Sequence, residues 1–282
     1  MSPYILEAQN LHYKYADGSS ALQGMNMAIK RNSKTAVLGA NGAGKTTFFL
    51  HCNGLLKPAG GKLQYAGCDF KYSKSYLQEL KKKVGIVFQN PDSQLFSASV
   101  RQDISFGLMN LGFSNQEAGF RIDKIGEELG ISDLFAKATH FLSVGQKKLV
   151  ALAGVLVMEP EVIICDEPTA GLDPLNSQIL LTALEEQHKK GSTLVISTHD
   201  VDLAYSWSDT VFIIDNGQVL AQGAPPSVLN NQAVLKQAHL QKPLILEVWE
   251  ELQKARMLRT SLKAPTNREE LLQLMNENKK NQ

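Results

Sequence analysis

The sequence predicts an α/β fold built on a parallel sheet, with a small helical appendage at its C-terminal end. Short apolar runs of strand length alternate with longer segments whose apolar residues follow the helix period, as a parallel sheet with covering helices requires. A strand, a glycine-rich loop and a helix follow one another between residues 35 and 53. After Gly223 the chain becomes polar and mostly helical in pattern, which marks the appendage.

The first predicted unit is a pair of strands. Within residues 4–29 apolar and polar residues alternate on both sides of a polar loop at 16–20. Such alternation is typical of half-buried strands, and Asp17-Gly18 supplies the turn. We therefore expect two strands joined at this loop.

The central elements follow in order. Residues 35–38 form a short buried strand, 39–44 the glycine-rich loop and 45–53 a helix that Gly54 and Pro58 end. Further strands are predicted at 62–65, 84–88, 162–165 and 193–197, and a hairpin at 211–221 that turns at Asn216-Gly217. Helices are predicted between them, at 76–82, 100–111, 115–129, 145–158 and 175–190.

The appendage starts at Pro225-Pro226. Its last helix is predicted to follow Thr266 as the capping residue, because Thr266 and Glu269 have capping-box spacing ahead of a leucine-rich run. Other apolar residues with helical spacing in the appendage are Leu244, Leu246, Val248, Trp249 and Leu252.

Composition excludes several classes of protein. The 29 Lys and Arg against 28 Asp and Glu give a formal charge of +1, so we expect no nucleic-acid partner. The cysteines, at 52, 68 and 165, form no CxxC pair, which argues against a disulfide framework or zinc site and fits a reducing, cytosolic setting. The N-terminus does not resemble a signal peptide, and the longest apolar run, 149–158, is too short to span a bilayer. A membrane role would therefore need a partner.

The strongest functional motif is the glycine-rich loop. Residues 39–46 match GxxxxGK[ST] between a predicted strand and a predicted helix, the context in which this motif binds phosphate. Backbone N–H groups would point at phosphate oxygens, the helix N-terminus adds a favourable dipole, and Lys45 reaches the β- and γ-phosphates. Thr46 would place its hydroxyl on Mg²⁺. The expected nucleotide-binding residues here are Gly39, Ala40, Asn41, Gly42, Ala43, Gly44, Lys45, Thr46 and Thr47.

A second motif is an apolar strand that ends in two carboxylates. Asp166 and Glu167 directly follow the run at 162–165. Asp166 is placed to hold Mg²⁺, and Glu167 to orient and polarise the water that attacks the γ-phosphate. Taken alone, this pattern is equally typical of a catalytic pair and of two exposed carboxylates after a strand. Its position downstream of a phosphate-binding loop favours the catalytic interpretation.

With these motifs in this order, the sequence resembles the ATPase subunits of ATP-binding-cassette (ABC) transporters over residues 4–222. Residues 142–146 (LSVGQ) are similar to that family's signature loop, 170–173 to its D-loop and His199 to its switch histidine. The resemblance implies an ABC-type P-loop NTPase fold with a RecA-like parallel sheet core, an N-terminal antiparallel β subdomain and a helical signature subdomain. It implies the following division: an ATPase domain at 1–223, with the helical subdomain at about 90–158, and a C-terminal helical region at 224–282.

The resemblance also implies roles for single residues. Tyr15 resembles the aromatic residue that stacks on adenine, with an ordinary strand aromatic as the alternative. Gln89 resembles the glutamine that touches Mg²⁺ and senses the membrane partner. His199 stands where the family places its γ-phosphate contact, a ring that can hydrogen-bond phosphate or orient water. The implied catalytic residues are Glu167, His199 and Gln89, and the implied Mg²⁺ ligands are Thr46, Gln89 and Asp166.

In this family the signature loop acts across a dimer. Ser143, Gly145 and the helix N-terminus would bind the γ-phosphate of an ATP held by the partner's P-loop, so that two ATP molecules lie in a two-fold interface. Gln146 and Asp173 belong to the same implied site. A homodimer and a heterodimer with a second ABC ATPase are both open, since an unlike partner could use the loop of this chain.

The signature loop departs from the family's LSGGQ pattern. Val144 replaces the first glycine, and Leu149 stands where an arginine is common. A β-branched side chain would be strained at a positive φ or would crowd the partner's nucleotide. We still expect hydrolysis, because Asp166, Glu167, Gln89 and His199 are all present.

A longer string narrows the resemblance. Residues 89–96 (QNPDSQLF) closely resemble the ATPases of energy-coupling factor (ECF) importers, and 97–100 and 153–160 are similar to their cobalt/nickel branch. Leu95 and Phe96 would dock a coupling helix of the transmembrane partner, unless they pack inward. The implied protein is a peripheral ATPase at the cytoplasmic face of the cell membrane. It would use ATP and Mg²⁺ to drive cobalt or nickel uptake with a transmembrane coupling subunit and a membrane substrate-binding subunit.

Other functions are open at this stage. An ECF importer of a B vitamin is a close variant, and a degenerate or regulatory subunit would bind ATP without turnover. A non-transport ABC protein on DNA or ribosomes fits less well, because this chain has neither a second cassette nor a strong positive charge. For the C-terminal region we expect dimerisation, anchored by Trp249 beside aliphatic residues, in preference to packing on the core.

Overall fold

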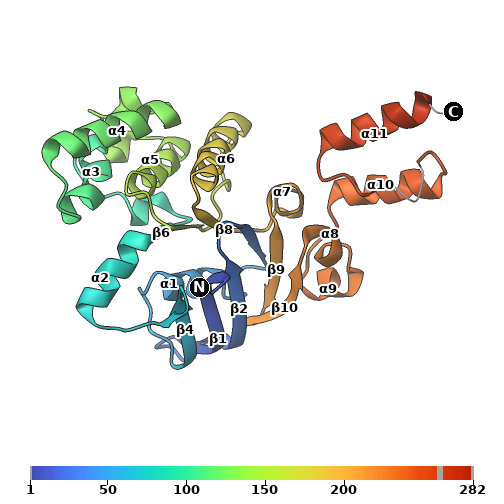
Figure 1. Ribbon diagram of the computed structural model, residues 1–282, viewed down its shortest axis with the longest axis horizontal. Coiled ribbons are helices and arrows are strands. Elements are labelled where there is room, and N and C mark those ends of the chain that lie inside the picture. The colour runs from blue at the N-terminus through green and yellow to red at the C-terminus, as the bar shows by residue number, and fades with distance from the viewer. Residues whose placement is uncertain (1, 259–262, 281–282) are drawn as a thin grey trace.

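The computed structural model describes residues 2–258 and 263–280 and has a six-stranded sheet at its centre (Figure 1). The strands are β3 (Lys34–Leu38), β6 (Val84–Val87), β7 (Val162–Cys165), β8 (Thr193–Thr198), β9 (Thr210–Asp215) and β10 (Gln218–Gly223). Their order across the sheet is β10-β9-β3-β8-β7-β6, and all neighbours pair in parallel except β10 with β9. The predicted parallel core is therefore confirmed.

A smaller antiparallel sheet lies against one face of the central one. Its strands are β1 (Tyr4–Lys14), β2 (Ser20–Lys30), β4 (Gly60–Tyr65) and β5 (Cys68–Asp69), in the order β2-β1-β4-β5. Phe48 and Phe49 of helix α1 (Lys45–Cys52) are fully buried in one cluster with Met25 of β2 and Val37 of β3. The helix that follows the glycine-rich loop is thus fixed in the apolar layer between the two sheets.

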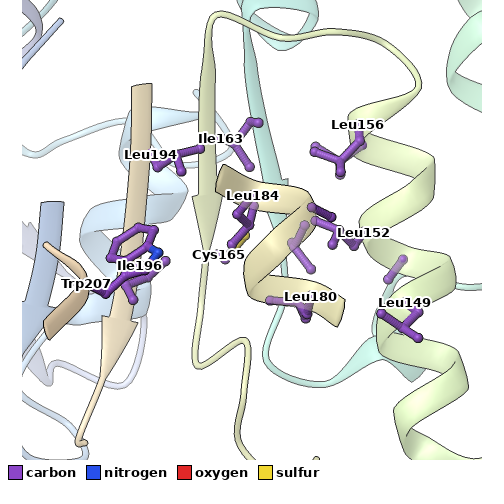
Figure 2. Packing of buried hydrophobic residues seen from close by; sticks show 14 of the residues in the cluster. Leu149, Leu152, Leu156, Ile163, Cys165, Leu180, Leu184, Leu194, Ile196 and Trp207 are labelled. Carbon is purple, nitrogen blue, oxygen red and sulfur yellow. The ribbon is translucent and has the colours of Figure 1, made fainter. Parts of the chain in front are cut away.

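The other face of the central sheet is covered by helices α5 (Val144–Leu156) and α6 (Pro174–Lys189) (Figure 2). Because β7 and β8 are buried on both faces, they read as continuous apolar runs. The labelled members of this cluster are Leu149, Leu152 and Leu156 of α5, Leu180 and Leu184 of α6, Ile163 and Cys165 of β7, Leu194 and Ile196 of β8, and Trp207.

A group of helices stands at one end of the molecule, where α3 (Val100–Asn110) and α4 (Asn115–Leu129) pack on α5 (Figure 1). Helix α2 (Lys74–Lys83) leads into β6 on the same side. Short 3-10 turns fill the connections at Pro91–Ser93, Ser132–Leu134 and Thr139–Phe141. No helix within 2–258 or 263–280 is both long enough and apolar enough to cross a bilayer.

The C-terminal helices lie at the opposite end (Figure 1). They are α8 (Pro225–Val228), α9 (Gln232–Gln237), α10 (Leu244–Lys254) and α11 (Arg268–Lys280). Trp249 of α10 is only 4% exposed and packs with Leu258 and Leu271. The expectation of Trp249 as an interface anchor is therefore wrong: its ring is already buried within the chain.

Two local features differ from the sequence analysis. The last helix begins one residue later than expected, because Asn267 accepts the Glu270 N–H at 2.9 Å and the Glu270 carboxylate accepts the Thr266 N–H at 2.7 Å. The cap is thus built on Asn267 and Glu270 in place of Thr266 and Glu269. Strand β5 and helix α7 (Val201–Trp207) were not predicted, since both are too short to show a clear period.

We expect Leu149→Ala to lower the free energy of unfolding by about 2–4 kcal/mol, because it leaves a cavity in the core. Leu149 is 3% exposed and faces α6 (Figure 2). Denaturant unfolding measures the change. Phe120→Ala, at a side chain that is 73% exposed, is the control and is expected to change stability by less than about 0.5 kcal/mol. Equal effects of the two substitutions would contradict the packing.

Candidate functional site

The sheet topology gathers the residues expected at the site. Strands β3, β8, β7 and β6 are parallel neighbours, so their carboxyl ends meet at one edge, where open α/β sheets bind ligands. The glycine-rich loop follows β3, His199 follows β8, Asp166 and Glu167 follow β7, and Gln89 follows β6. Four distant segments of sequence therefore converge on one site.

The glycine-rich loop has a backbone that only glycine accepts without strain. Gly42 and Gly44 have φ of 82° and 105°. A Cβ on Gly44 would lie 2.6 Å from the Ala21 carbonyl oxygen, and one on Gly39 would lie 2.4 Å from that of Ile214. Gly44 is also the N-cap of α1, so the first N–H groups of that helix point toward the loop without a competing side chain. This is a cradle for an anion.

Lys45 lies across this loop. Its ammonium group donates to the carbonyl oxygens of Gly39 at 2.7 Å and Ala40 at 3.2 Å, and its side chain is nearly buried. The same nitrogen is 3.9 Å from Oε1 of Glu167. The Lys45 ammonium group therefore lies between the glycine-rich loop and the carboxylate of Glu167.

The two carboxylates after β7 have different surroundings. Asp166 is 2% exposed and accepts hydrogen bonds from the hydroxyls of Thr46 and Ser197. Glu167 has the left-handed φ of 47°, and its N–H donates to Ser197 Oγ at 2.9 Å. Its Oε2 is 3.0 Å from Nδ1 of His199, while its Oε1 is buried and has no hydrogen-bond partner in the described part of the chain. Asp166 is thus fixed, and Glu167 keeps a free acceptor.

Two adjoining cavities open on these groups. One, of about 540 Å³, is lined by the glycine-rich loop together with Tyr15, Gln89, Asp166 and Glu167. The other, of about 610 Å³, adds His199 and the segment 239–241 to Gln89 and Glu167. Gln89 and Glu167 therefore face both spaces.

Tyr15 stands at the rim of the first cavity, just after β1. Its hydroxyl is 2.9 Å from the Thr47 hydroxyl, and its ring packs edge-on against Tyr13 with centroids 5.1 Å apart. The ring is 39% exposed. An aromatic face is thus held beside the loop, where a base could stack.

The residues present fit a nucleotide and a divalent ion. The cradle is closed to side chains by its backbone contacts, and a buried cation and an orphan carboxylate oxygen face it. The hydroxyl of Thr46, the carboxylate of Asp166 and the amide of Gln89 are oxygen donors, the type that Mg²⁺ prefers. Thr46 and Asp166 already touch, and Gln89 lines the same cavity.

The signature residues lie elsewhere. Among the described residues, Ser143, Gly145, Gln146 and Asp173 line neither cavity. Ser143 caps α5, and Gln146 completes the capping box, with contacts of 3.2 and 3.1 Å between side chains and backbone N–H groups. Asp173 caps α6, where hydrogen bonds from Asn176 lower the pKa of its carboxyl. The chain alone does not bring these groups to its own glycine-rich loop.

The two departures from the signature pattern have local explanations. Val144 is the first residue of α5, so its backbone is helical, and the expected strain at a positive φ is wrong. Its side chain is 57% exposed. Leu149, in contrast, is a core residue, and an arginine there would have to enter the apolar layer between α5 and α6.

The string at 89–96 divides into an inner and an outer part. Gln94 points inward, and its Oε1 accepts the Phe88 N–H at 3.1 Å. Leu95 is half-buried against the core and lines a cavity together with Phe96, whose side chain is 65% exposed, so the docking expectation stays a prediction for both residues. Phe96 packs edge-on against Phe106 of α3 beside a cavity of about 280 Å³.

Two polar residues of the site were missed in the sequence. Ser197 is the penultimate residue of β8, and its hydroxyl donates to Asp166 and accepts from the Glu167 N–H. Lys148 lies in an apolar helix, one turn before Leu152, yet is 4% exposed. The sequence held the same signal in both cases. Each polar residue stands at a position where the helical or strand pattern predicts a buried apolar side chain.

Comparisons with known proteins agree with this geometry. The family profile described as "ABC transporter" matches residues 22–170. EcfA2 of Clostridium perfringens, an energy-coupling factor transporter ATP-binding protein, is 47% identical over 87% of this chain and 86% of its own length. An ABC transporter ATP-binding protein of Methanosarcina mazei is 46% identical over 89% of this chain, which spans about half, 55%, of that relative.

Among solved structures, CbiO1 of Clostridium perfringens, part of the ABC transporter complex CbiONQ, has a TM-score of 0.74 and 46% identity. The match covers 88% of this chain and 100% of that one. The chain therefore belongs to the ABC transporter ATPase family, in the group of energy-coupling factor transporter ATP-binding proteins.

Proposed function

We propose that this chain hydrolyses ATP in a dimer at the cytoplasmic face of the cell membrane, to drive uptake of cobalt or nickel ions through membrane partners. The observation that carries the proposal is the convergence of Lys45, Asp166, Glu167 and His199 on one edge of the parallel sheet. The choice of cobalt or nickel is supported by the strings at 97–100 and 153–160.

In the proposed reaction the side chains and backbone groups of this chain bind the phosphates of ATP and orient the attacking water. The loop N–H groups and Lys45 hold the phosphates, and the Glu167 carboxylate orients the attacking water through its free Oε1. His199, held by Oε2 of that carboxylate, contacts the γ-phosphate. Thr46, Asp166 and Gln89 would hold Mg²⁺, which would supply charge neutralisation for the phosphates when bound.

A dimer is supported by the exposed position of the signature loop. Ser143 and Gly145 begin α5 outside the cavities of their own chain, and a helix N-terminus attracts an anion. In a two-fold arrangement the loop of one protomer can complete the site of its partner, with Gln146 and Asp173 beside it. The partner is a second copy or an unlike ABC ATPase.

We propose that residues 1–223 form the ATPase domain, with its helical subdomain at about 90–158, and that 224–282 contribute to dimerisation. Residues 259–262 and 281–282 of the last segment lie outside the described residues. With Trp249 buried, Leu244 and Val248, which are 62% and 37% exposed, are the apolar residues of α10 left for such a contact.

Membrane attachment would use the cavity beside Phe96. Phe96 and Phe106 are exposed aromatic side chains at its rim, suited to an apolar coupling helix of a transmembrane subunit. A separate membrane subunit would bind the substrate. Localisation at the membrane would then depend on this surface.

Tyr15 gives a direct test of nucleotide recognition. We expect Tyr15→Ala to weaken ATP binding about tenfold, because base stacking on an aromatic ring contributes about 1–3 kcal/mol. Tyr15→Phe keeps the ring and is expected to stay within about threefold. Calorimetric titration with ATP measures both. Unchanged affinity in Tyr15→Ala would make Tyr15 an ordinary strand aromatic.

The proposed docking of a coupling helix at the cavity beside Phe96 can be tested by substitution of Phe96. We expect Phe96→Ser to reduce the membrane-bound fraction of the protein at least about fivefold in cells that contain its membrane subunits, since exposed aromatics are frequent anchors of interfaces. Phe120→Ser, on helix α4 and 73% exposed, is the matched control. Loss of binding in both variants, or in neither, would argue against a specific groove.

Transport itself is tested by uptake. In a host that lacks the chromosomal copy, the wild-type chain is expected to restore uptake of labelled Co²⁺ or Ni²⁺, whereas Glu167→Gln is not. Restored uptake of a B vitamin would replace the metal substrate with the vitamin alternative. Failure to restore any uptake, despite ATP hydrolysis by the purified chain, would favour a non-transport function.

A further inference from the structure

Lys148 is a buried cation that the proposed reaction does not use. It lies on α5 between Lys147, which pairs with Asp92 at 2.7 Å, and the core residue Leu149. Only 4% of Lys148 is exposed, and burial lowers the pKa of its ammonium group. A buried charge is unfavourable unless specific partners satisfy it. Specific hydrogen-bond acceptors are therefore expected around the Lys148 ammonium group.

Those partners are backbone carbonyls of the catalytic loop. The Lys148 Nζ donates to the carbonyl oxygens of Ala170 at 2.7 Å, Glu167 at 2.8 Å and Pro168 at 3.2 Å. An ammonium group has three donors, so all of them are used. The lysine thus closes the turn that begins at Glu167.

Glu167 needs such support, because its backbone is unusual. A φ of 47° is uncommon for a residue other than glycine and persists where the surroundings determine it. Its N–H is held by Ser197 of β8 and its carbonyl by Lys148 of α5. With both backbone groups fixed, the carboxylate is directed at His199 and the cavity.

We propose that Lys148 is a positioning residue for ATP hydrolysis: its ammonium group holds the Glu167 backbone and joins the signature helix to the catalytic carboxylate. The inference rests on the proposed role of Glu167. Ser143 caps the same helix, and Gly145 packs near Asn176 of α6, so the signature loop and the catalytic loop form one packed unit. Displacement of this helix would then move Glu167.

The first test separates positioning from binding. We expect Lys148→Met to lower kcat about tenfold or more while KM for ATP changes less than about threefold, because a small misplacement of a catalytic group slows chemistry more than binding. Lys148→Gln keeps two donors and is expected to lose less. Lys147→Met, the neighbouring lysine on the same helix, is the control and is expected to stay within about twofold. Circular dichroism checks folding, and Lys148→Gln carries the test if Lys148→Met does not fold.

The second test is a double-mutant cycle with Glu167→Ala. Residues that act through one another are not additive. Without a carboxylate to position, Lys148→Met is expected to change the residual single-turnover rate less than about twofold. A general structural effect would instead reduce the rate by the same factor in both backgrounds.

Two results would overturn the inference: wild-type kcat in Lys148→Met, or equal losses with and without Glu167. A third result has a different meaning. If Glu167→Ala itself hydrolyses ATP at the wild-type rate, the proposed role of Glu167 fails, and the positioning role of Lys148 fails with it.

Discussion

Glu167→Gln is expected to slow ATP hydrolysis by at least about 100-fold and to leave ATP binding within about threefold, because general-base catalysis contributes about 10²–10⁴-fold. The buried Oε1 has no partner among the described residues and faces the cavity, so it is available to the attacking water. Glutamine has nearly the same shape and can still accept from His199, but its amide cannot take up a proton.

The measurement is the steady-state ATPase rate with Mg²⁺, with light scattering recorded as ATP is added. The wild type is expected to turn over, and Glu167→Gln to accumulate an ATP-bound dimer. Glu161→Gln is a matched control, since Glu161 precedes the opposite end of β7 and pairs with Arg31 and Lys83. Its rate is expected to stay within about twofold of wild type.

Other outcomes would change the interpretation. Turnover at the wild-type rate in Glu167→Gln would exclude Glu167 as the base. If the wild type neither hydrolyses ATP nor dimerises, the signature loop with Val144 is insufficient by itself. An unlike partner ATPase would then be required, or the chain would be a regulatory subunit.

Much of the site could be predicted because its residues stand at the ends of strands. The glycine-rich loop, Asp166, Glu167 and His199 each follow a short apolar run, and such runs become neighbours in a parallel sheet. What no local pattern shows is the order of strands, in which β8 lies between β3 and β7. That order brings His199 to 3.0 Å from Glu167.

Most of the residues that sequence patterns placed wrongly or missed depend on contacts between separate segments. Trp249 has the composition of an interface anchor, yet Leu258 and Leu271 of the same chain cover it. Val144 was expected to be strained, but Ser143 caps a helix that starts there. Lys148 was assigned no role from the sequence, and the three carbonyl oxygens that accept from its ammonium group lie about twenty positions further along the chain. For Trp249 and Lys148 the deciding partners are tertiary neighbours that local periodicity does not show, whereas Val144 is decided by a cap on the neighbouring residue.

Lys45→Met is expected to weaken ATP binding at least about 30-fold, a loss of about 2 kcal/mol. Methionine has a similar length, but it removes a nearly buried cation from the loop that faces the phosphates. It also removes the positive charge 3.9 Å from the carboxylate of Glu167, which is itself 5% exposed. A buried carboxylate without its cation would repel the γ-phosphate. The substitution therefore weakens ATP binding in two ways, by loss of the phosphate contact and by this repulsion.

Calorimetric titration with ATP in chelator, where hydrolysis does not proceed, measures this loss. Lys62→Met, at an exposed lysine of β4, is the control for removal of one positive charge and is expected to bind as wild type does. Lys45→Met combined with Glu167→Gln is expected to regain at least about threefold in affinity, because the repelling charge is gone. Wild-type affinity in Lys45→Met would contradict phosphate binding by this loop. No recovery in the double variant would instead mean that Lys45 acts on the phosphates alone, with Glu167 screened from them.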